Sequence, residues 1–203
     1  MIVRHLDPQL VQSPTWLRFR APQSFAGNDF LRLKASIIHA GGNVQPIKVW
    51  HNGDGRVELV YGSRRRQACL EAGLPVLALV DEAPVSGPQV VMELDASNEG
   101  VSLYERGRLY ASALDAGLFP SRRRLADVIG RPLSEVVAAV DLARLPQDLM
   151  ACFLDPRALT PATAKKLASL VARDPEQALR RAAAVKAQHF TKSTDVAKAL
   201  LAA

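Results

Sequence analysis

The stretch Tyr61-Gly62-Ser63-Arg64-Arg65-Arg66-Gln67-Ala68 decides how the first half of this chain is interpreted. A strand-like apolar run, 57–61, precedes it, and a helix-like run, 67–72, follows it and stops at Gly73. A strand, a Gly-Ser turn and a helix N-terminus together form a geometry that holds phosphate, because the first backbone N–H groups point outward and the helix dipole favours an anion. Arginine adds a bidentate donor. The alternative is a solvated basic helix start, since the full Walker spacing with its lysine is absent.

The segments around this stretch predict a small mixed sheet with helices beside it. Asp29–His39 has the apolar periodicity of an amphipathic helix, and Val44–Trp50 is typical of a short strand. Asn52–Gly55 predicts a hairpin turn that leads into the return strand 57–61, and Val76–Val80 predicts a third strand. This order of helix, hairpin, helix and strand is typical of an α+β domain.

From about Leu103 onward the pattern is helical, with glycines and prolines at the breaks. The second half is therefore predicted to be an all-α domain. The helices are expected at Leu103–Ala116, Arg122–Ile129, Leu133–Leu145, Gln147–Leu154, Pro161–Ala172 and Pro175–Gln188.

Arg122–Asp141 fits the twenty-residue helix-turn-helix template. Ala126 falls where a small residue must lie against the second helix, and Gly130 falls where the turn needs a left-handed residue. Val136 falls at a core position of the second helix. This match predicts a DNA-binding helix in the major groove. The alternative is an ordinary helical hairpin, which needs the same glycine but not that alanine.

The positive charge lies in the second half. Residues 1–100 carry 10 Lys/Arg and 10 Asp/Glu, whereas residues 101–203 carry 16 and 10, which gives the whole net charge of +6. A basic half is a candidate for nucleic acid, although a solubilised helical surface would have the same charge. Ser134 and Glu135 are the candidates for base contacts. The candidates for phosphate contacts are Arg122, Arg123, Arg124, Arg131, Arg144, Lys165 and Lys166.

Several classes of protein are disfavoured by what the sequence lacks. The two cysteines are isolated, without a CxxC or Cys/His cluster, so neither a disulfide framework nor a zinc site is expected. No apolar run reaches the roughly 18 residues of a membrane span. The N-terminus does not read as a signal peptide, and a cytoplasmic protein is expected.

Taken together, these motifs resemble the ParB-type partition proteins, particularly their plasmid-borne branch. The resemblance covers roughly residues 30–170. It rests on Gln45-Pro46-Ile47, on Gly62–Arg66 and on Ser102–Gly107 ahead of the helix-turn-helix. It implies a nucleotide-binding domain over 1–100 and a DNA-binding helical domain over 101–190. The remaining residues, 191–203, are expected to be a tail too short for the family's separate dimerisation domain.

The resemblance also implies a function. Family members bind CTP with magnesium, close as a dimeric clamp on centromere DNA, and act with a Walker-type ATPase of the ParA class in plasmid or chromosome segregation. The protein is thus expected on the nucleoid or on a plasmid. Residues carried over to the nucleotide are Gly62, Ser63, Arg64, Arg65 and Arg66 for the triphosphate, with Asn43, Gln45 and Pro46 near the base.

The sequence departs from the family where a Glu-Asn pair is expected. Leu94-Asp95 stands there, and Asp95 is the candidate magnesium ligand, since a carboxylate oxygen suits that ion. Weak CTP hydrolysis therefore stays open. A ParB-like repressor that no longer uses nucleotide is the second hypothesis. An enzyme with turnover as its main role is the third, but the four histidines have no partner motif that would support it.

Overall fold

The computed structural model describes residues 2–13, 19–51, 56–81, 86–97, 100–188 and 190–202. The chain divides into two compact units, Met1–Glu99 and Gly100–Ala203, and each is described by itself. The predicted hairpin turn Asn52–Gly55 lies outside the described residues. Within them, no helix is long and apolar enough to cross a lipid bilayer.

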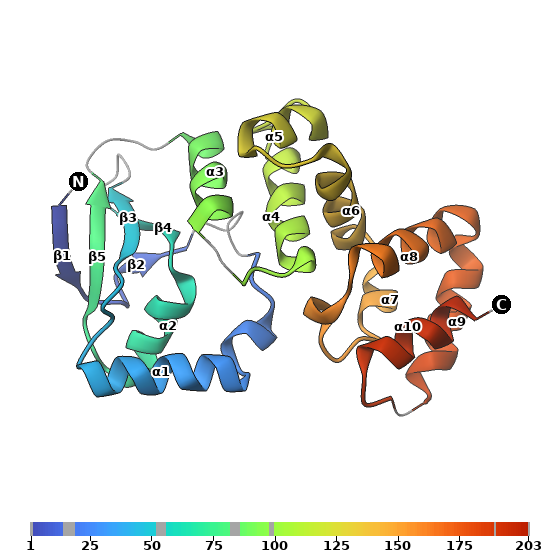
Figure 1. Ribbon diagram of the computed structural model, residues 1–203, viewed down its shortest axis with the longest axis horizontal. Helices are drawn as coiled ribbons and strands as arrows, with labels where there is room; N and C mark the ends of the chain where they lie inside the picture. Colours follow the sequence, from blue (N-terminus) through green and yellow to red (C-terminus); the bar gives the residue numbers. More distant parts are fainter. Residues whose placement is uncertain are drawn as a thin grey trace. The chain divides into compact units, whose positions relative to one another are not determined.

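The first unit is built on a five-stranded mixed sheet in the order β1-β5-β3-β4-β2 (Figure 1). β3 runs parallel to β5 and antiparallel to β4, while β1 is antiparallel to β5 and β2 is parallel to β4. The three predicted strands are present. The two edge strands were missed, because β1 is exposed along most of its length and β2 is only two residues long. The strands are Ile2–Leu6 (β1), Val11–Gln12 (β2), Ile47–His51 (β3), Val57–Tyr61 (β4) and Val76–Asp81 (β5).

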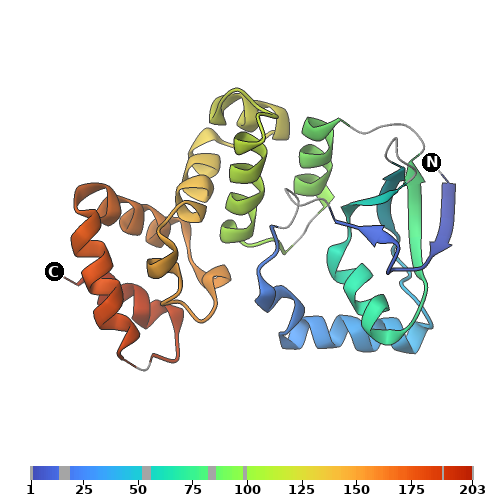
Figure 2. The same cartoon turned by 180° about the vertical axis from the view of Figure 1, so that it is seen from behind.

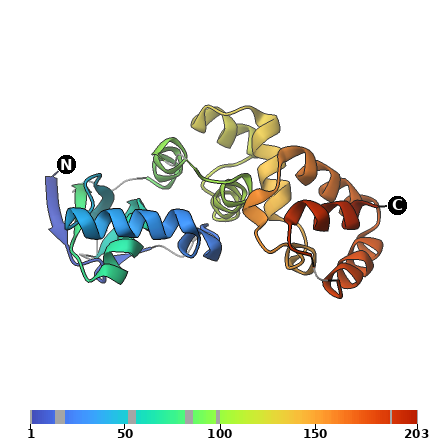
Figure 3. The ribbon, with the colours of Figure 1, turned by 60° about the horizontal axis from the view of Figure 1, so that its bottom comes forward.

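Helices α1 and α2 pack against each other and share a core with the sheet, and Figure 3 shows α1 in front, with α2 behind it. Phe30 and Ile37 of α1 are buried with Cys69 of α2 in one core, together with inward-facing residues of β3, β4 and β5. A further helix, α3, packs along β4. The helical segments of this unit are Pro22–Phe25 (η2), Asn28–Ala40 (α1), Ser63–Ala72 (α2) and Gly87–Ser97 (α3).

Lys48, in the middle of β3, links the sheet to α3. Its side chain is 6% exposed, and its ammonium lies 2.6 Å from Glu93 of α3 and 3.2 Å from Asp81 at the end of β5. Burial lowers the pKa of Lys48, but the hydrogen bonds and charges of the two carboxylates outweigh it and raise the pKa above its ordinary value. The buried ammonium is therefore neutralised by two carboxylates, and its ion pair with Glu93 fastens α3 to the sheet.

The second unit consists of helices, as predicted, and Figure 2 shows α8 to α10 (orange to red) gathered at its C-terminal end. One expectation is corrected: residues 191–203 are not only a tail. Ser193–Leu201 forms α10, because Val196, Ala197 and Leu200 are buried in the core of this unit. The other helices are Leu103–Asp115 (α4), Arg122–Ile129 (α5), Leu133–Ala143 (α6), Gln147–Met150 (α7), Pro156–Ala158 (η3), Pro161–Arg173 (α8) and Pro175–Lys186 (α9).

Helices α4 and α6 cross at very short range. A Cβ atom on Gly107 of α4 would come within 1.9 Å of the Ala139 carbonyl oxygen of α6, so only glycine fits there. The start of α4 is fixed by a capping box, in which the Ser102 hydroxyl accepts from the Glu105 backbone N–H and the Glu105 carboxylate accepts from Ser102 N–H. The helix pair therefore has a defined register as well as a close contact.

Helices α5 and α6 are joined by a three-residue turn, 130–132. The residues of the sequence template take the expected positions: Gly130 has φ +71° at the end of α5, Ala126 is 3% exposed and Val136 is fully buried. Ser121 caps α5 by accepting from the Arg124 backbone N–H, which places the arginine run in the first turn of α5.

Candidate nucleotide and DNA sites

The arginine stretch forms the first turn of α2, not a turn ahead of it. β4 ends at Tyr61, and Gly62 takes φ +96° so that α2 begins at Ser63. Gly62 also lies against β3, since a Cβ atom there would meet the Ile47 Cγ2 atom at 2.6 Å. No described side chain caps this helix. Its first backbone N–H groups and the positive end of its dipole are thus presented together with the arginines.

A pocket of about 380 Å³, called here the basic pocket, opens at this N-terminus. None of the described residues that line it is acidic, and three of them are arginines. Five of the predicted nucleotide ligands line it: Gln45, Gly62, Ser63, Arg64 and Arg65. Four lining residues were not predicted from the sequence: Arg20, Leu33, Ala96 and Ser97. Arg20 carried no motif signal, because it lies more than forty residues before the arginine stretch.

Arg64 is available to an anion. Its guanidinium lies 6.0 Å from the centre of the Phe30 ring, and among the described residues it has neither a hydrogen-bonding partner nor a carboxylate. Its Nε atom is buried without a hydrogen-bond acceptor. Because a buried donor without an acceptor costs free energy, an anion in the basic pocket would relieve that cost.

Arg65 has a different role from the one predicted. It lines the basic pocket, but its Nη1 atom donates to the carbonyl oxygens of Gln45, at 2.9 Å, and Pro46, at 2.6 Å. Burial lowers the pKa of Arg65 below its ordinary value. The guanidinium fastens the segment before β3 to the start of α2, and thereby sets one wall of the pocket.

Three predicted ligands are held elsewhere by the fold. Asn43 is 5% exposed, and its amide donates to the carbonyls of Gln45 and Leu77 while its oxygen accepts from Leu77 N–H at 2.7 Å. Its side chain is therefore committed to positioning the chain before β3 against β5. Pro46 supplies only its carbonyl, to Arg65. Arg66 does not line the basic pocket, and burial lowers the pKa of its guanidinium.

A second pocket of about 250 Å³ adjoins the basic pocket, and the two share Arg20, Gly62 and Ser63. We call it the aromatic pocket because three aromatic side chains line it. A basic pocket that continues into an apolar, aromatic one matches a ligand with an anionic end and a planar end. Its other lining residues are Ser13, Phe19, Phe25, Leu59, Val60, Tyr61 and Leu94.

The predicted metal ligand, Asp95, lies between residues of the two pockets but lines neither. It is 8% exposed within α3 and has interactions inside the protein. The described residues contain no group of three or more His, Cys, Asp or Glu side chains that would hold a metal ion. The site does not present a protein-built cage for magnesium, and the assignment of Asp95 stays a prediction.

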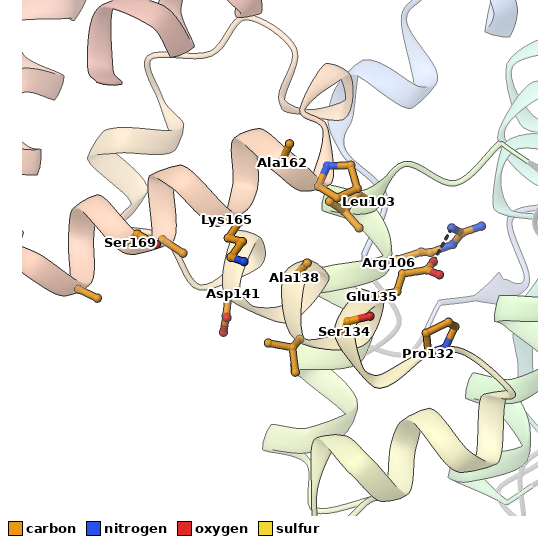
Figure 4. Close-up of a pocket in the computed structure, with 14 residues that line it drawn as sticks. Leu103, Arg106, Pro132, Ser134, Glu135, Ala138, Asp141, Ala162, Lys165 and Ser169 are labelled. Carbon is orange, nitrogen blue, oxygen red and sulfur yellow. Dashed lines mark hydrogen bonds and ion pairs between the residues drawn. The ribbon is translucent and has the colours of Figure 1, made fainter. Parts of the chain in front are cut away.

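In the second unit, a groove of about 1020 Å³ runs between α6 and α8, and we call it the α6–α8 groove (Figure 4). Ser134 and Glu135 line it from α6, and Lys165 points into it from α8. Three of the predicted DNA contacts therefore lie along one surface. None of the α6 residues that line this groove is basic.

Three of the seven predicted phosphate contacts, Arg122, Arg131 and Arg144, are paired with carboxylates. Glu135 is held by Arg131 at 3.1 Å and by Arg106 of α4 at 3.3 Å. Arg122 of α5 lies 2.8 Å from Asp141 of α6. Arg144 pairs with Asp115 at 2.5 Å. By contrast, four other predicted contacts are exposed and have no ion pair among the described residues: Arg123, Arg124, Lys165 and Lys166.

Comparison with known proteins agrees with these features. The family model of the ParB N-terminal domain matches residues 3–96, the part that carries both pockets of the first unit. The probable chromosome-partitioning protein ParB of Treponema pallidum (strain Nichols) is 29% identical over 170 residues, which are 83% of this chain and 51% of that protein. The chain thus spans about half the length of this curated relative.

Solved structures show the same fold. The C-terminally truncated chromosome-partitioning protein ParB from Caulobacter crescentus, complexed to the centromeric parS site, aligns with a TM-score of 0.50 at 22% identity, over 91% of this chain and 97% of that chain. That protein complexed with CTP-gamma-S aligns with a TM-score of 0.38 at 23% identity, over 91% of this chain and 99% of that chain. The family match lies within the first unit, and the solved parS complex shows the same fold over most of the chain. Residues 3–96 match the ParB N-terminal domain family, and over 170 residues the chain is similar to a ParB chromosome-partitioning protein.

Proposed function

We propose that this chain is a DNA-binding partition protein whose first unit binds a nucleoside triphosphate and whose second unit binds double-stranded DNA. The nucleotide that the family resemblance implies is CTP. One observation carries the nucleotide half of the proposal: the uncapped start of α2 opens into a pocket lined by arginines and by no described acidic residue. A triphosphate is the biological ligand that such a pocket matches in charge and donor geometry.

The residues divide the work of binding. Arg64 contributes an unpaired guanidinium, and the backbone N–H groups at Ser63 and after it contribute donors along the helix dipole. Arg65 positions the Gln45-Pro46 carbonyls at the wall of the pocket. The aromatic pocket beyond Gly62 is the place for the base and ribose, because it is apolar and shares its boundary with the basic pocket.

The DNA half of the proposal rests on α5, the turn and α6. The buried Ala126 and Val136, with Gly130 in the left-handed region, support a DNA-binding helix-turn-helix with α6 as the recognition helix. Ser134 and Glu135 would meet base edges, and Glu135 is an acceptor suited to a cytosine amino group. The parS complex of the Caulobacter relative supports a centromere-like site as the DNA partner.

The finer parts of the proposal follow from the resemblance. We place magnesium with the nucleotide, a homodimer as the working form, a ParA-type ATPase as the partner, and the nucleoid or a plasmid in the cytoplasm as the location. Magnesium binds nucleotides mainly through phosphate oxygens and water, so it does not require a cage built by the protein.

Calorimetry with CTP and magnesium, with and without duplex DNA, tests the nucleotide half. We expect binding in wild type, and a loss of roughly tenfold or more in Arg64→Ala, because a charge-assisted pair with phosphate contributes about 1.5–3 kcal/mol. Arg66→Ala is the matched control: it removes the same charge from the same helix but not from the pocket. Thermal melting verifies that both variants fold. Absence of CTP binding in wild type, or equal losses in the two variants, contradicts the placement.

A second candidate function is a ParB-like transcriptional repressor that does not use nucleotide. The environment of α3 favours it, because Leu94 lines the aromatic pocket while Asp95 lines neither pocket. In that case, duplex affinity would be indifferent to CTP, and a promoter near the binding site would be repressed. A change in duplex affinity or dissociation rate on addition of CTP rejects the repressor.

A further inference from the structure

The second unit has another large concavity, on the side of α8 that faces α9 and α10. This α8–α10 pocket measures about 1110 Å³. Five of its lining side chains are cationic, and none of the described residues that line it is acidic. The cations come from three helices: Lys165, Lys166 and Arg173 from α8, Arg181 from α9 and Lys198 from α10.

Most of this charge is not neutralised by the protein. Lys165, Lys166 and Arg173 have no ion pair among the described residues. Lys198 faces Asp195 at 3.6 Å, but both are exposed, and such a pair contributes little. Arg181 is positioned by donating to the Leu200 carbonyl at 3.1 Å, a bond that leaves its charge intact. A concentration of cations without counter-charges costs free energy, which an anion would relieve.

The α8–α10 pocket is continuous with the α6–α8 groove. Ala162, Lys165 and Ser169 line both, so α8 forms a ridge between two adjoining concavities. The pocket also presents hydroxyl groups, at Ser169 and Thr194, which are common donors to phosphate oxygens. A polyanion lying in the α6–α8 groove would meet the cations of the pocket on crossing this ridge.

We propose that the α8–α10 pocket is a second DNA contact, which binds the phosphate backbone of the duplex that α6 reads. This inference rests on the proposed DNA-binding function and extends it from the helix-turn-helix to the C-terminal helices. The pocket contributes affinity and a longer footprint but no choice of sequence, because its donors match phosphate and not base edges. The hydroxyls and the continuity with the groove favour DNA over an acidic protein segment.

The salt dependence of duplex binding tests this inference. The probes are two mixed-sequence duplexes of different base composition, each about three helical turns long. The double variant Arg173→Ala/Lys198→Ala should reduce the slope of log affinity against log salt concentration by about two, since each phosphate contact contributes about one to this slope. It should weaken the binding of both duplexes equally. The loss at low salt should be roughly tenfold.

The matched control is Arg180→Ala/Lys192→Ala. It also removes two positive charges from exposed positions of the same unit, but neither residue lines the pocket. Its salt slope should equal that of wild type. Ser134→Ala, in the α6–α8 groove, tests the proposed function separately, since it should change the preference between duplexes and leave the salt slope intact.

The possible results separate the two claims. If wild type binds neither duplex, the DNA-binding function fails and the inference fails with it. If wild type binds and the pocket and control variants behave alike, only the inference is overturned. If a polyglutamate peptide binds wild type and not the pocket variant, while duplex binding is unchanged, the pocket belongs to an acidic protein and the inference is again overturned.

Discussion

The arginines at the start of α2 and those around α6 differ in what they contact. Arg64 lines the basic pocket with neither a carboxylate nor a hydrogen-bonding partner among the described residues. Around α6, by contrast, Glu135 holds both Arg106 and Arg131, and Asp141 holds Arg122. Arg64 is ready for an external anion, whereas the paired arginines around α6 must exchange an internal anion for an external one.

This difference has consequences for affinity and for selectivity. An unpaired arginine adds its full interaction with phosphate to binding, because nothing has to be broken first. A paired arginine adds less, since the carboxylate competes with the phosphate and also repels it. If α6 binds DNA as proposed, these pairs should reduce nonspecific attraction and favour a duplex that offers a donor to Glu135.

The largest expected effect tests whether every arginine of α2 is a ligand. Arg65→Ala should lower the free energy of unfolding by roughly 2 kcal/mol, because it leaves the half-buried carbonyls of Gln45 and Pro46 without their donor. Arg64→Ala should change the free energy of unfolding by less than about 0.5 kcal/mol, because Arg64 makes neither of these two hydrogen bonds. Urea unfolding measures both. Equal stabilities would show that Arg65 does not fasten the segment before β3.

A smaller effect tests whether the pairing around α6 restrains binding. Glu135→Gln removes the carboxylate that holds two arginines, so mixed-sequence duplexes should bind several-fold more tightly, about 1 kcal/mol, with a steeper salt slope. Glu176→Gln is the control, because it releases Arg180 on the exposed face of α9, away from the groove. Fluorescence anisotropy at several salt concentrations gives both quantities. If Glu135→Gln bound all duplexes more weakly, the ion pairs of Glu135 would not be what restrains DNA binding at α6.

The smallest effect concerns neighbours within α5. Arg123 and Arg124 are exposed and have no ion pair among the described residues, whereas Arg122 is paired with Asp141. Replacing either exposed arginine by alanine should reduce the salt slope of duplex binding by about one. Arg122→Ala should reduce it by clearly less, because Asp141 already competes with phosphate for the Arg122 guanidinium. Identical slopes in all three variants would mean that pairing does not set the contribution of an arginine.

Local signals were sufficient to predict much of the fold. The strand 57–61, the helix after Gly62 and the helix-turn-helix spacing of Ala126, Gly130 and Val136 are where the pattern placed them. β1 and β2 were missed because an exposed edge strand does not need the alternating pattern that marks a half-buried one.

The candidate site was less accessible to sequence reasoning. Gly62, Ser63 and Arg64 were found because they are consecutive, whereas Arg20 reaches the same pocket from a distant segment. The pattern also could not separate ligands from framework residues. Asn43 and Arg65 are polar and stand in the expected motifs, yet their hydrogen bonds go to backbone groups of the protein. Only the partners of a polar side chain distinguish the two roles.

The close crossing at Gly107 gives the second unit a mechanical property. With no side chain between α4 and the Ala139 carbonyl, and with Arg106 bound to Glu135 one turn away, the two helices cannot slide past each other without breaking backbone contact. Because their backbones are so closely packed, the two helices resist relative displacement. A displacement of α6 would carry α4 with it, from the capped start of α4 at Ser102 to its end at Asp115. Within the second unit, α4 and α6 are therefore expected to move as one rigid element.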